Sequence, residues 1–510
     1  MMFRLLYKLS LAIYRHFLRP VIRRLPGNLS YRTVACLHRL RRALFISSDD
    51  SAQAMGWPVH YTAEKRKGIP AWLREEMLSL ASLEYEINPN IIQSHGLEFA
   101  PLAIHPAGGR VYRKLMNLVA HREGYDYILI APWVKMGGAD LVTLCHLRYL
   151  SKRRVRVLLI LTEVTHSAWL DKVPKEIDIL QFGKEASWLS PIEQESVLMR
   201  LLIQLEPRCV HNINSRLAWS CIKNSGKTLA AISDVYVSLY CDDYDKDGCP
   251  VGYGREFLRE SAPYIRKILT DNCSYPEQIC AAYGLPLAAF EVVKVPTDES
   301  LLKLPISRSE GNRKVIWSGR FDPQKRPELL LEVAKLLPDV EFHVYGQAVV
   351  SGRNKLSHFE SQKNITVFSP YSSFQAVAED YRVLLNTSAW DGLPNILVEA
   401  AASGMVIVTS NVGGITDLVD EVTGFLVDNH SDPTAYAEAI TQCLSNIVVS
   451  SKKAECARLR VLQNHSWRAF ECKLDEVFAN LWGRNRMVQW AQAAEKKHLC
   501  EGVTERENEK

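Results

Sequence analysis

The sequence predicts an α/β protein with two doubly wound, Rossmann-like halves. Short apolar runs typical of buried parallel strands alternate with helix-like segments, and a polar, proline-punctuated segment separates two such series. We therefore expect a first domain at 125–297, a linker at 298–312 and a second domain at 313–455. Before them we expect a basic, mainly helical extension at 1–124, and after them the chain ends in a polar tail at 485–510.

Each predicted domain contains several strand-like runs. In the first domain these are YDYILIAP, VRVLLILT, PRCVHNINS, KTLAAIS and VYVSLYCD. In the second they are VIWSGRF, VEFHVYG, ITVFSP, YRVLLNTS and MVIVTS, with helices expected at PELLLEVAKLLP and NILVEAAASG. Strands that alternate with helices form a parallel sheet with both faces covered, and ligands bind such sheets at the carboxyl ends of the strands. Two facing sheets also predict a cleft between them.

The composition is that of a globular protein, with 47% hydrophobic and 23% charged residues in 510. The net charge of +5 is unevenly placed, because residues 1–48 hold ten Lys and Arg and no acidic residue. This argues against a nucleic-acid-binding surface and for a local anionic partner. No apolar run reaches the roughly 18 residues of a membrane-spanning helix. The twelve cysteines form no Cys-x-x-Cys pair, which is typical of reduced, buried thiols in a cytosol-like compartment.

Residues 1–24 predict an amphipathic helix. Arg4, Lys8, Arg15 and Arg19 fall on one side at helical period, and apolar side chains lie largely on the other. Such a helix can lie on an anionic bilayer surface with its apolar face down. The alternative is a helix packed on its own protein with solvated arginines. We expect the first arrangement, and with it a cytoplasmic protein that is peripheral on the cytoplasmic face of a membrane.

Two cations follow the first strand of the second domain in SGRFDPQKRPELL. Arg320 comes directly after the strand-like run, and Lys325 precedes a helix expected to begin near Pro327. Two cations at a strand end beside a helix N-terminus suit a diphosphate. The alternative is an ordinary solvated basic loop.

A carboxylate pair lies further along in DGLPNILVE. We expect Asp391 to end a strand, Gly392 and Pro394 to shape the turn, and Asn395 to cap the next helix. Glu399 then lies about one turn inside that helix, where its carboxylate can reach the hydroxyl pair of a sugar. The alternative is a capped helix with one partly exposed glutamate.

A Gly-Gly turn at Gly413 and Gly414 completes the series, at a place where backbone can approach a ligand closely. In order and spacing, residues 313–445 resemble the nucleotide-sugar domain of the retaining GT-B glycosyltransferases of family four. One departure is Asp391, because the first acid of this motif is usually Glu. The donor site that the resemblance implies comprises Gly319, Arg320, Lys325, Asp391, Gly392, Leu393, Pro394, Asn395, Glu399, Gly413 and Gly414.

The first domain resembles the family more loosely. KMGGAD places Gly137 and Gly138 at the family's Gly-Gly turn, near donor or acceptor, with Asp140 as an acid there. His211 in VHNINS is expected at a strand end, like the family's sugar-contacting histidine; a half-buried structural histidine is the alternative. Residues 456–484 resemble the closing helix that returns to the first domain in this fold.

Three other motifs match a known pattern only in part. DDYDKDG opens like a calcium loop, but Gly254 stands where the loop needs Glu, and the run also mimics the Asp-x-Asp motif of another glycosyltransferase fold. NSGKT ends like a phosphate loop, yet Cys221 replaces its first glycine, and GYGREF is half of a dinucleotide fingerprint. We expect no metal and no cofactor.

The resemblance implies a retaining glycosyltransferase that moves a sugar from a nucleotide-sugar donor to a glycan or lipid-linked acceptor, as in bacterial surface-polysaccharide synthesis. Arg320 and Lys325 would stabilise the leaving diphosphate without a metal, and Glu399 would hold the ribose. Two alternatives stay open: a nucleotide-sugar epimerase of the same fold, with acid–base carboxylates in its first domain, and a catalytically silent partner subunit.

Deleting residues 1–24 tests the membrane prediction. We expect the truncated protein to sediment less with anionic vesicles, because the basic face of the helix is gone, while nucleotide binding stays intact. Neutral vesicles serve as the control. Equal sedimentation of the two proteins with anionic vesicles would contradict the prediction.

Overall fold

The computed structural model describes residues 71–81, 83, 87–90, 106–119, 124–306, 312–346, 359, 361–371 and 373–482. The helix predicted at 1–24 and the tail predicted at 485–510 lie outside these residues. The chain divides into two compact units, Met1–Lys114 and Leu115–Lys510, and both sheets belong to the second unit. Before the first sheet the structure describes α5 (Ala71–Leu80) and α7 (Pro106–Val119).

The first domain is a seven-stranded parallel sheet of order β3-β2-β1-β4-β5-β8-β9. Its strands are β1 (Tyr127–Ala131), β2 (Val157–Leu161), β3 (Asp178–Leu180), β4 (Cys209–Ile213), β5 (Asp234–Ser238), β8 (Lys267–Thr270) and β9 (Phe290–Val292). All five residues of β1, β2 and β4 are buried. Continuous apolar burial is what a sheet covered on both faces requires.

The helices of the first domain include one segment predicted to be a strand. They are α8 (Gly138–Lys152), α9 (Phe182–Ala186), α10 (Pro191–Leu205), α11 (Arg216–Ile232), α12 (Tyr253–Ser261) and α13 (Ser274–Tyr283). The strand prediction for KTLAAIS is wrong, because these residues form the end of α11 and the turn after it. A short apolar run does not distinguish a strand from a buried helix by periodicity alone.

The second domain is a six-stranded parallel sheet of order β12-β11-β10-β13-β14-β15. Its strands are β10 (Lys314–Ser318), β11 (Glu341–Tyr345), β12 (Ile365–Phe368), β13 (Val383–Asn386), β14 (Val406–Ser410) and β15 (Phe425–Val427). Together with the first sheet, this confirms the predicted α/β class with two Rossmann-like domains.

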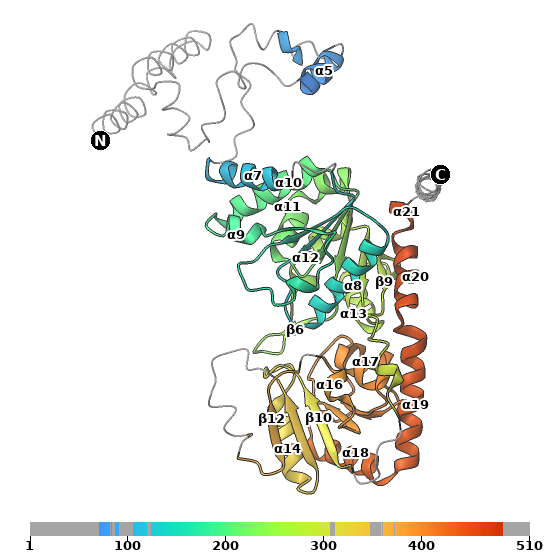
Figure 1. The fold of residues 1–510 in the computed structure, drawn as a ribbon. Helices are drawn as coiled ribbons and strands as arrows, with labels where there is room; N and C mark the ends of the chain where they lie inside the picture. Colours follow the sequence, from blue (N-terminus) through green and yellow to red (C-terminus); the bar gives the residue numbers. More distant parts are fainter. Residues whose placement is uncertain are drawn as a thin grey trace, which may run out of the picture. The chain divides into compact units, whose positions relative to one another are not determined.

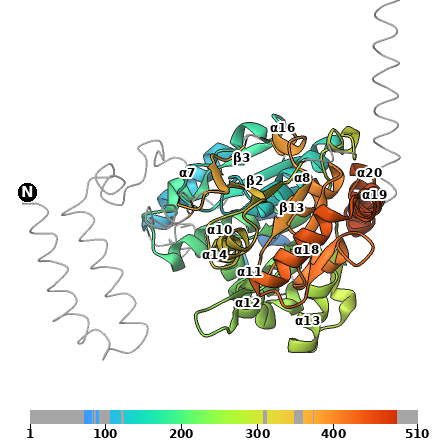
Figure 2. The ribbon, with the colours of Figure 1, turned by 90° about the horizontal axis from the view of Figure 1, so that it is seen from below.

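Two apolar clusters cover the second sheet. One contains side chains of α14 (Pro327–Leu336) and α18 (Pro433–Ser445), which pack against each other (Figure 2). The other contains side chains of α16 (Gln375–Ala378) and α17 (Asn395–Ala402). Leu301 and Leu304, from the segment predicted as a linker, are buried in this second cluster. That segment therefore contributes to the core of the second domain.

The strand orders place a topological switch point in each sheet. Chain direction across the sheet reverses between β1 and β4 in the first domain, and between β10 and β13 in the second. Loops that leave two such neighbouring strands diverge to opposite faces, which opens a crevice at the carboxyl edge. The loop 319–326 after β10 and the loop 387–394 after β13 leave the switch point of the second sheet.

The last helices connect both domains. Ala457 and Val461 of α19 (Ile447–Asn464) lie in a core cluster of the second domain. Phe470 of α20 (Trp467–Val477) and Phe478, which precedes α21 (Ala479–Trp482), lie in the core of the first. Figure 1 shows α19 beside the second domain and α20 beside the first. The chain thus crosses back to the domain from which it came.

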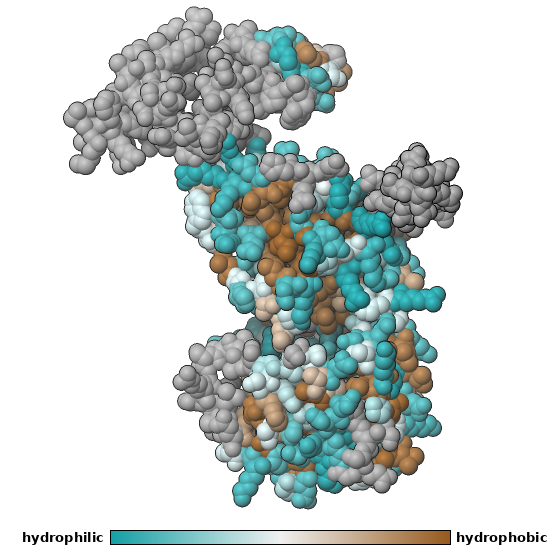
Figure 3. All heavy atoms as spheres, in the orientation of Figure 1, coloured by the Kyte–Doolittle hydropathy of each residue, from teal (hydrophilic) through white to brown (hydrophobic). Residues whose placement is uncertain are grey.

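The structure also shows helix lengths, surface hydropathy and the exposure of the thiols. No helix among the described residues is both long enough and apolar enough to cross a membrane. In the view of Figure 3, apolar side chains gather across part of the first domain, whereas on the second domain they are more scattered among polar ones. The prediction that the thiols are buried is wrong for Cys249, Cys273 and Cys472, which are exposed.

Candidate active site

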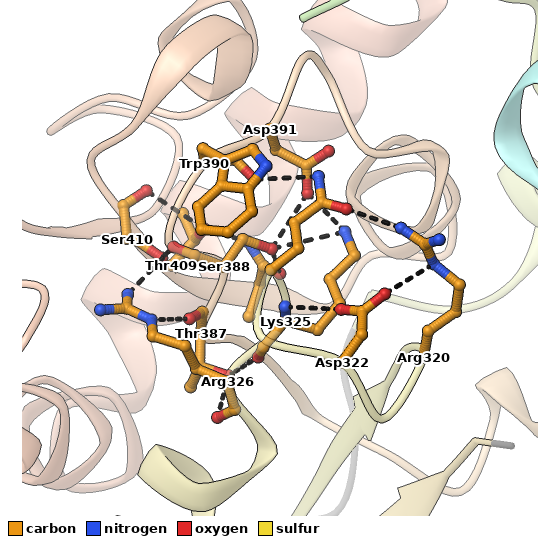
Figure 4. Close-up of polar contacts among 12 residues, drawn as sticks. Arg320, Asp322, Lys325, Arg326, Thr387, Ser388, Trp390, Asp391, Thr409 and Ser410 are labelled. Carbon is orange, nitrogen blue, oxygen red and sulfur yellow. Dashed lines mark hydrogen bonds and ion pairs between the residues drawn. The ribbon is translucent and has the colours of Figure 1, made fainter. Parts of the chain in front are cut away.

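The two loops at the switch point of the second sheet are joined to each other. Thr387 Oγ1 donates to the carbonyl of Lys325 at 2.7 Å and accepts from Trp317 Nε1 at 2.9 Å. Arg326 Nε donates to the carbonyl of Thr387 at 2.7 Å. Figure 4 shows the resulting network of polar contacts. Backbone carbonyls bonded in this way hold both loops as one unit.

An ion pair links the same two loops. Lys325 Nζ contacts Asp391 Oδ2, and the two side chains are only 15% and 13% exposed. Ser388 Oγ lies 3.0 Å from the same carboxylate oxygen. A charge held mostly away from water needs a charged partner, and here each residue is the partner of the other. An anion that binds Lys325 therefore meets an ammonium already fixed in place.

Arg320 lies on the same edge and is more open, with its side chain 59% exposed. Its Nε lies 3.1 Å from Asp322 Oδ2, and its Nη2 donates to Gln324 Oε1 at 2.6 Å. Gln324 is buried and donates in turn to the carbonyl of Trp390 at 3.1 Å. The structure thus brings Arg320, Lys325 and Asp391 together, as Figure 4 shows.

Glu399 lies in the second turn of α17, close to the predicted depth. Burial, with a further contribution from the charge of Asp298, raises the pKa of its carboxyl to about 7. No hydrogen bond or ion pair links it to another described residue. Burial raises the pKa of Tyr371, and the charge of Glu399 adds to this shift; the Tyr371 hydroxyl lies 2.9 Å from Ser318 Oγ at the end of β10. Glu399 is therefore a half-buried carboxyl near the switch point, with no hydrogen bond or ion pair to the side chains that the structure describes.

Two expectations about the loop before α17 are wrong. Asp391 does not end a strand, because β13 stops at Asn386. Asn395 does not cap α17, because Pro394 occupies the cap position without a side-chain bond. The Asn395 amide instead donates to the carbonyl of Gly138 at 3.5 Å, a weak contact with the first domain. Leu393 is buried in the core of its own domain, and Pro394 is buried beside it.

The predicted glycines lie where backbones approach closely. Gly413 has a φ of +52°, and a Cβ there would lie 1.9 Å from the carbonyl oxygen of Asp391. A Cβ on Gly414 would lie 2.3 Å from the Cβ of Asn272. A Cβ on Gly392 would lie 3.0 Å from the carbonyl oxygen of Tyr240. Gly392 and Gly414 thus allow the second domain to approach the first.

On the first domain, the Gly-Gly turn comes where the sequence predicts it. Gly137 precedes α8 in extended conformation, and Gly138 begins the helix. Asp140 Oδ1 accepts from the amide of Lys135 at 3.0 Å, and burial raises the pKa of Asp140. This acid therefore fastens its own turn, and Gly138 presents its carbonyl to α17 as described above.

His211 does not lie at a strand end, so that expectation is wrong. It lies in the middle of β4 and is fully buried. Its Nδ1 lies 2.7 Å from Tyr127 Oη, and its Nε2 lies 2.9 Å from Ser238 Oγ. Burial beside His146 lowers its pKa well below the usual range. With both nitrogens bonded inside the core, His211 belongs to the packing of the first sheet.

Sequence reasoning missed the loop after β8. Asp271 and Asn272 are buried there, and their side chains lie within 3.2 Å of a Cβ built on Gly392. Burial raises the pKa of Asp271 to about 7; the hydrogen bond from Asn272 and the charge of Lys294 lower it, and the charge of Asp391 raises it. The only sequence signal was a polar Asp-Asn pair at the end of an apolar run.

The three partly matching motifs have structural roles. Among the described residues, no group of three or more His, Cys, Asp and Glu side chains could hold a metal ion. In DDYDKDG, Asp245 Oδ1 accepts from the amides of Asp247 and Cys249 at 3.0 and 2.9 Å, which closes a hairpin turn. NSGKT lies inside α11, and GYGREF leads into α12.

Comparison with known proteins agrees with this architecture. Residues 312–446 match the family described as Glycosyl transferases group 1. A poly(ribitol-phosphate) alpha-N-acetylglucosaminyltransferase of Staphylococcus aureus is 30% identical over 157 residues, 29% of this chain and 31% of the relative. The O-antigen biosynthesis glycosyltransferase WbnH of Escherichia coli is 25% identical over 245 residues, 47% of this chain and 61% of the relative. The match thus spans under a third of the length of the first relative and about three fifths of the length of the second.

Solved structures show the fold over more of the chain. Anabaena Alr3699/HepE, solved with UDP and glucose, has a TM-score of 0.57 and 16% identity, and the match covers 70% of this chain and all of that one. TarM, which S. aureus makes, has a TM-score of 0.58 and 12% identity, with 70% and 99% covered. These likenesses confirm the predicted GT-B arrangement of two Rossmann-like domains.

The raised pKa of Glu399 predicts a pH dependence of stability. The folded protein keeps this proton up to about pH 7, whereas an ordinary glutamate loses it near 4.5. The free energy of unfolding therefore falls as pH rises through this window. Glu399→Gln removes the titration, so the variant should gain about 1 to 3 kcal/mol over the wild type between pH 5 and pH 8. Urea unfolding at several pH values measures the difference.

The matched control is Glu332→Gln, which changes an exposed carboxyl on α14. Its unfolding free energy should follow that of the wild type across the whole pH range. A constant difference between Glu399→Gln and the wild type would contradict the raised pKa of the Glu399 carboxyl.

Proposed function

We propose that this protein is a retaining glycosyltransferase that uses a nucleotide-sugar donor. The observation that carries the proposal is the placement of Arg320 and Lys325 on one edge of the second sheet, joined to Asp391 across the switch point. Two cations at the carboxyl ends of parallel strands suit a nucleoside diphosphate. The family matched by residues 312–446 and the names of the relatives support the same activity.

The leaving group would be held without a metal. As the bond between the anomeric carbon and the diphosphate oxygen breaks, negative charge grows on the diphosphate, and Arg320 and Lys325 would stabilise it. The half-exposed guanidinium of Arg320 is accessible, and Lys325 would exchange part of its contact with Asp391 for a phosphate oxygen. Backbone N–H groups at the start of α17 would add further donors.

The acceptor hydroxyl would attack the same face that the diphosphate leaves. A bond forms between the acceptor oxygen and the anomeric carbon, and the hydroxyl proton passes to the departing phosphate oxygen. No enzyme nucleophile would take part, and the anomeric configuration would be retained because the acceptor attacks from the face that the diphosphate leaves. Asp391 and Gly392 would place the donor sugar, since they lie between the cations and the first domain.

Glu399 would hold the ribose. Its carboxyl has no bonding partner among the described residues, so ribose hydroxyls would supply the missing hydrogen bonds. Because its pKa is raised to about 7, the group can donate as well as accept near neutral pH.

The acceptor we propose is a glycan or lipid-linked glycan of the cell surface. Met136 and Val164, which are 58% and 63% exposed, follow β1 and β2 at the carboxyl edge of the first sheet. Exposed apolar side chains at this edge suit a lipid-linked substrate. The relatives named for O-antigen and poly(ribitol-phosphate) support this class, as does the basic segment 1–24, which we propose holds the protein at the cytoplasmic membrane face.

A second candidate function is favoured by Asp271. An epimerase of nucleotide sugars needs acid–base carboxylates in the first domain, and Asp271 is such a carboxyl with a pKa of about 7. The two functions differ in their need for an acceptor. An epimerase converts the nucleotide sugar without any acceptor. A transferase releases nucleoside diphosphate faster when an acceptor is present. A silent subunit shows neither reaction.

The site variants test the proposed chemistry. Arg320→Ala and Lys325→Ala should each lower kcat on the order of 100- to 1,000-fold, because charge on the diphosphate grows in the transition state. Glu399→Gln should mainly raise the donor KM, by about 10- to 100-fold, because its contact is present in the ground state as well. Asp391→Asn should have an intermediate effect on kcat, smaller than that of the two cation variants and larger than that of Glu399→Gln. Release of nucleoside diphosphate from a panel of nucleotide sugars measures these constants.

The control is Lys335→Ala, which removes an exposed cation of α14 whose side chain contacts Glu332. It should leave kcat and KM unchanged, and thermal melts should show that all variants fold. If Arg320→Ala and Lys325→Ala fold and keep near-normal turnover, the diphosphate assignment is wrong.

A further inference from the structure

A small acidic hairpin of the first domain is not explained by the proposed chemistry. Strands β6 (Asp243–Tyr244) and β7 (Pro250–Val251) form it, and they belong to neither large sheet. Its turn is closed by Asp245 and by Gly248, which has a φ of +77°. This is the DDYDKDG run that mimics metal motifs in the sequence.

The base of the hairpin is anchored in the first domain. Asp242, whose side chain is 3% exposed, accepts from Arg255 Nε at 2.7 Å and from Tyr275 Oη at 3.1 Å. A buried carboxylate with a charged and a neutral donor is held firmly. The residues that follow it therefore start from a fixed position on the first domain.

The next two residues contact the second domain. Trp390 Nε1 donates to Asp243 Oδ1 at 3.3 Å. The rings of Tyr244 and Trp390 lie 5.2 Å apart at 59°. Trp390 directly precedes Asp391, so the hairpin meets the loop at the residue next to the ion pair.

From Trp390, bonded contacts lead to both cations. Its backbone carbonyl accepts a hydrogen bond from Gln324 Nε2. Gln324 Oε1 in turn accepts one from Arg320 Nη2. The following residue, Asp391, contacts Lys325. Figure 4 shows Trp390, Asp391, Arg320 and Lys325 in this one cluster. A displacement of Trp390 would thus move the side chains of Arg320 and Lys325, which we propose bind the diphosphate.

We propose that the hairpin of β6 and β7 positions the leaving-group cations. Asp243 and Tyr244 hold Trp390 when the two domains are in contact, and through Gln324 and Asp391 they orient Arg320 and Lys325. The role of the cations rests on the proposed function; the mechanical coupling of hairpin to loop does not. Asp243, Tyr244, Trp390 and Gln324 are positioning residues, because each acts through another side chain.

A double-mutant cycle tests the coupling. Tyr244→Ala and Trp390→Ala should each lower kcat by about 3- to 10-fold, the range expected for one aromatic contact or hydrogen bond, with little change in donor KM. The double variant should be no slower than the slower single variant, because both changes remove the same contact. Tyr244→Phe keeps the ring and should keep kcat.

Hydrogen exchange gives a second readout that does not depend on activity. Amides in residues 387–395 should exchange about 3- to 10-fold faster in Tyr244→Ala than in the wild type, since the loop loses its contact on the first domain. Asp247→Asn is the matched control. It changes an exposed side chain of the same hairpin, and this side chain makes no contact with Trp390 that the structure describes.

Unchanged exchange at 387–395 in Tyr244→Ala would overturn the proposal. So would effects of the two single variants on kcat that multiply in the double variant, or a loss in Tyr244→Phe equal to that in Tyr244→Ala. A wild type that neither binds nucleoside diphosphate nor releases it from any donor contradicts the proposed function alone, and the exchange measurement still decides the coupling.

Discussion

The ion pair between Lys325 and Asp391 is the interaction on which the rest of the site depends. Both side chains are largely shielded from water, so either one alone would carry a desolvation cost of several kcal/mol. The pair is at the same time the link between the loops after β10 and β13. Because these loops leave the switch point of the sheet, the fold itself puts their ends side by side.

A second constraint is the close approach of the two domains around the same loop. Gly392 and Gly414 have almost no room for a side chain, because Tyr240, Asp271 and Asn272 of the first domain lie against them. The donor loop is thus held on one side by its own sheet and on the other by the first domain. The C-terminal helices support this arrangement, since α19 and α20 belong to the cores of different domains. Contact between the domains and the geometry of the cations are therefore coupled.

The sequence was sufficient for the features that depend on local pattern. Apolar runs located all the strands of the second sheet except β15, and the position of Arg320 and Lys325 after the first of them followed from the order of elements. It was insufficient where tertiary packing decides. KTLAAIS is apolar enough for a strand but continues a helix, and His211 is polar but lies inside a sheet core. The loop 387–394 is contacted by Asp271, Asn272 and the hairpin of β6 and β7. These contacts depend on how two separate domains are arranged, which a local sequence pattern does not indicate.

The most direct measurement is calorimetric titration of the protein with nucleoside diphosphates in EDTA. Cations supplied by side chains should bind the diphosphate equally well with the chelator and with added magnesium or manganese. Lys325→Ala should weaken the binding of the diphosphate on the order of tenfold or more. It should weaken the binding of the corresponding monophosphate much less. Binding that appears only with a divalent ion, or that Lys325→Ala leaves unchanged, would contradict the account.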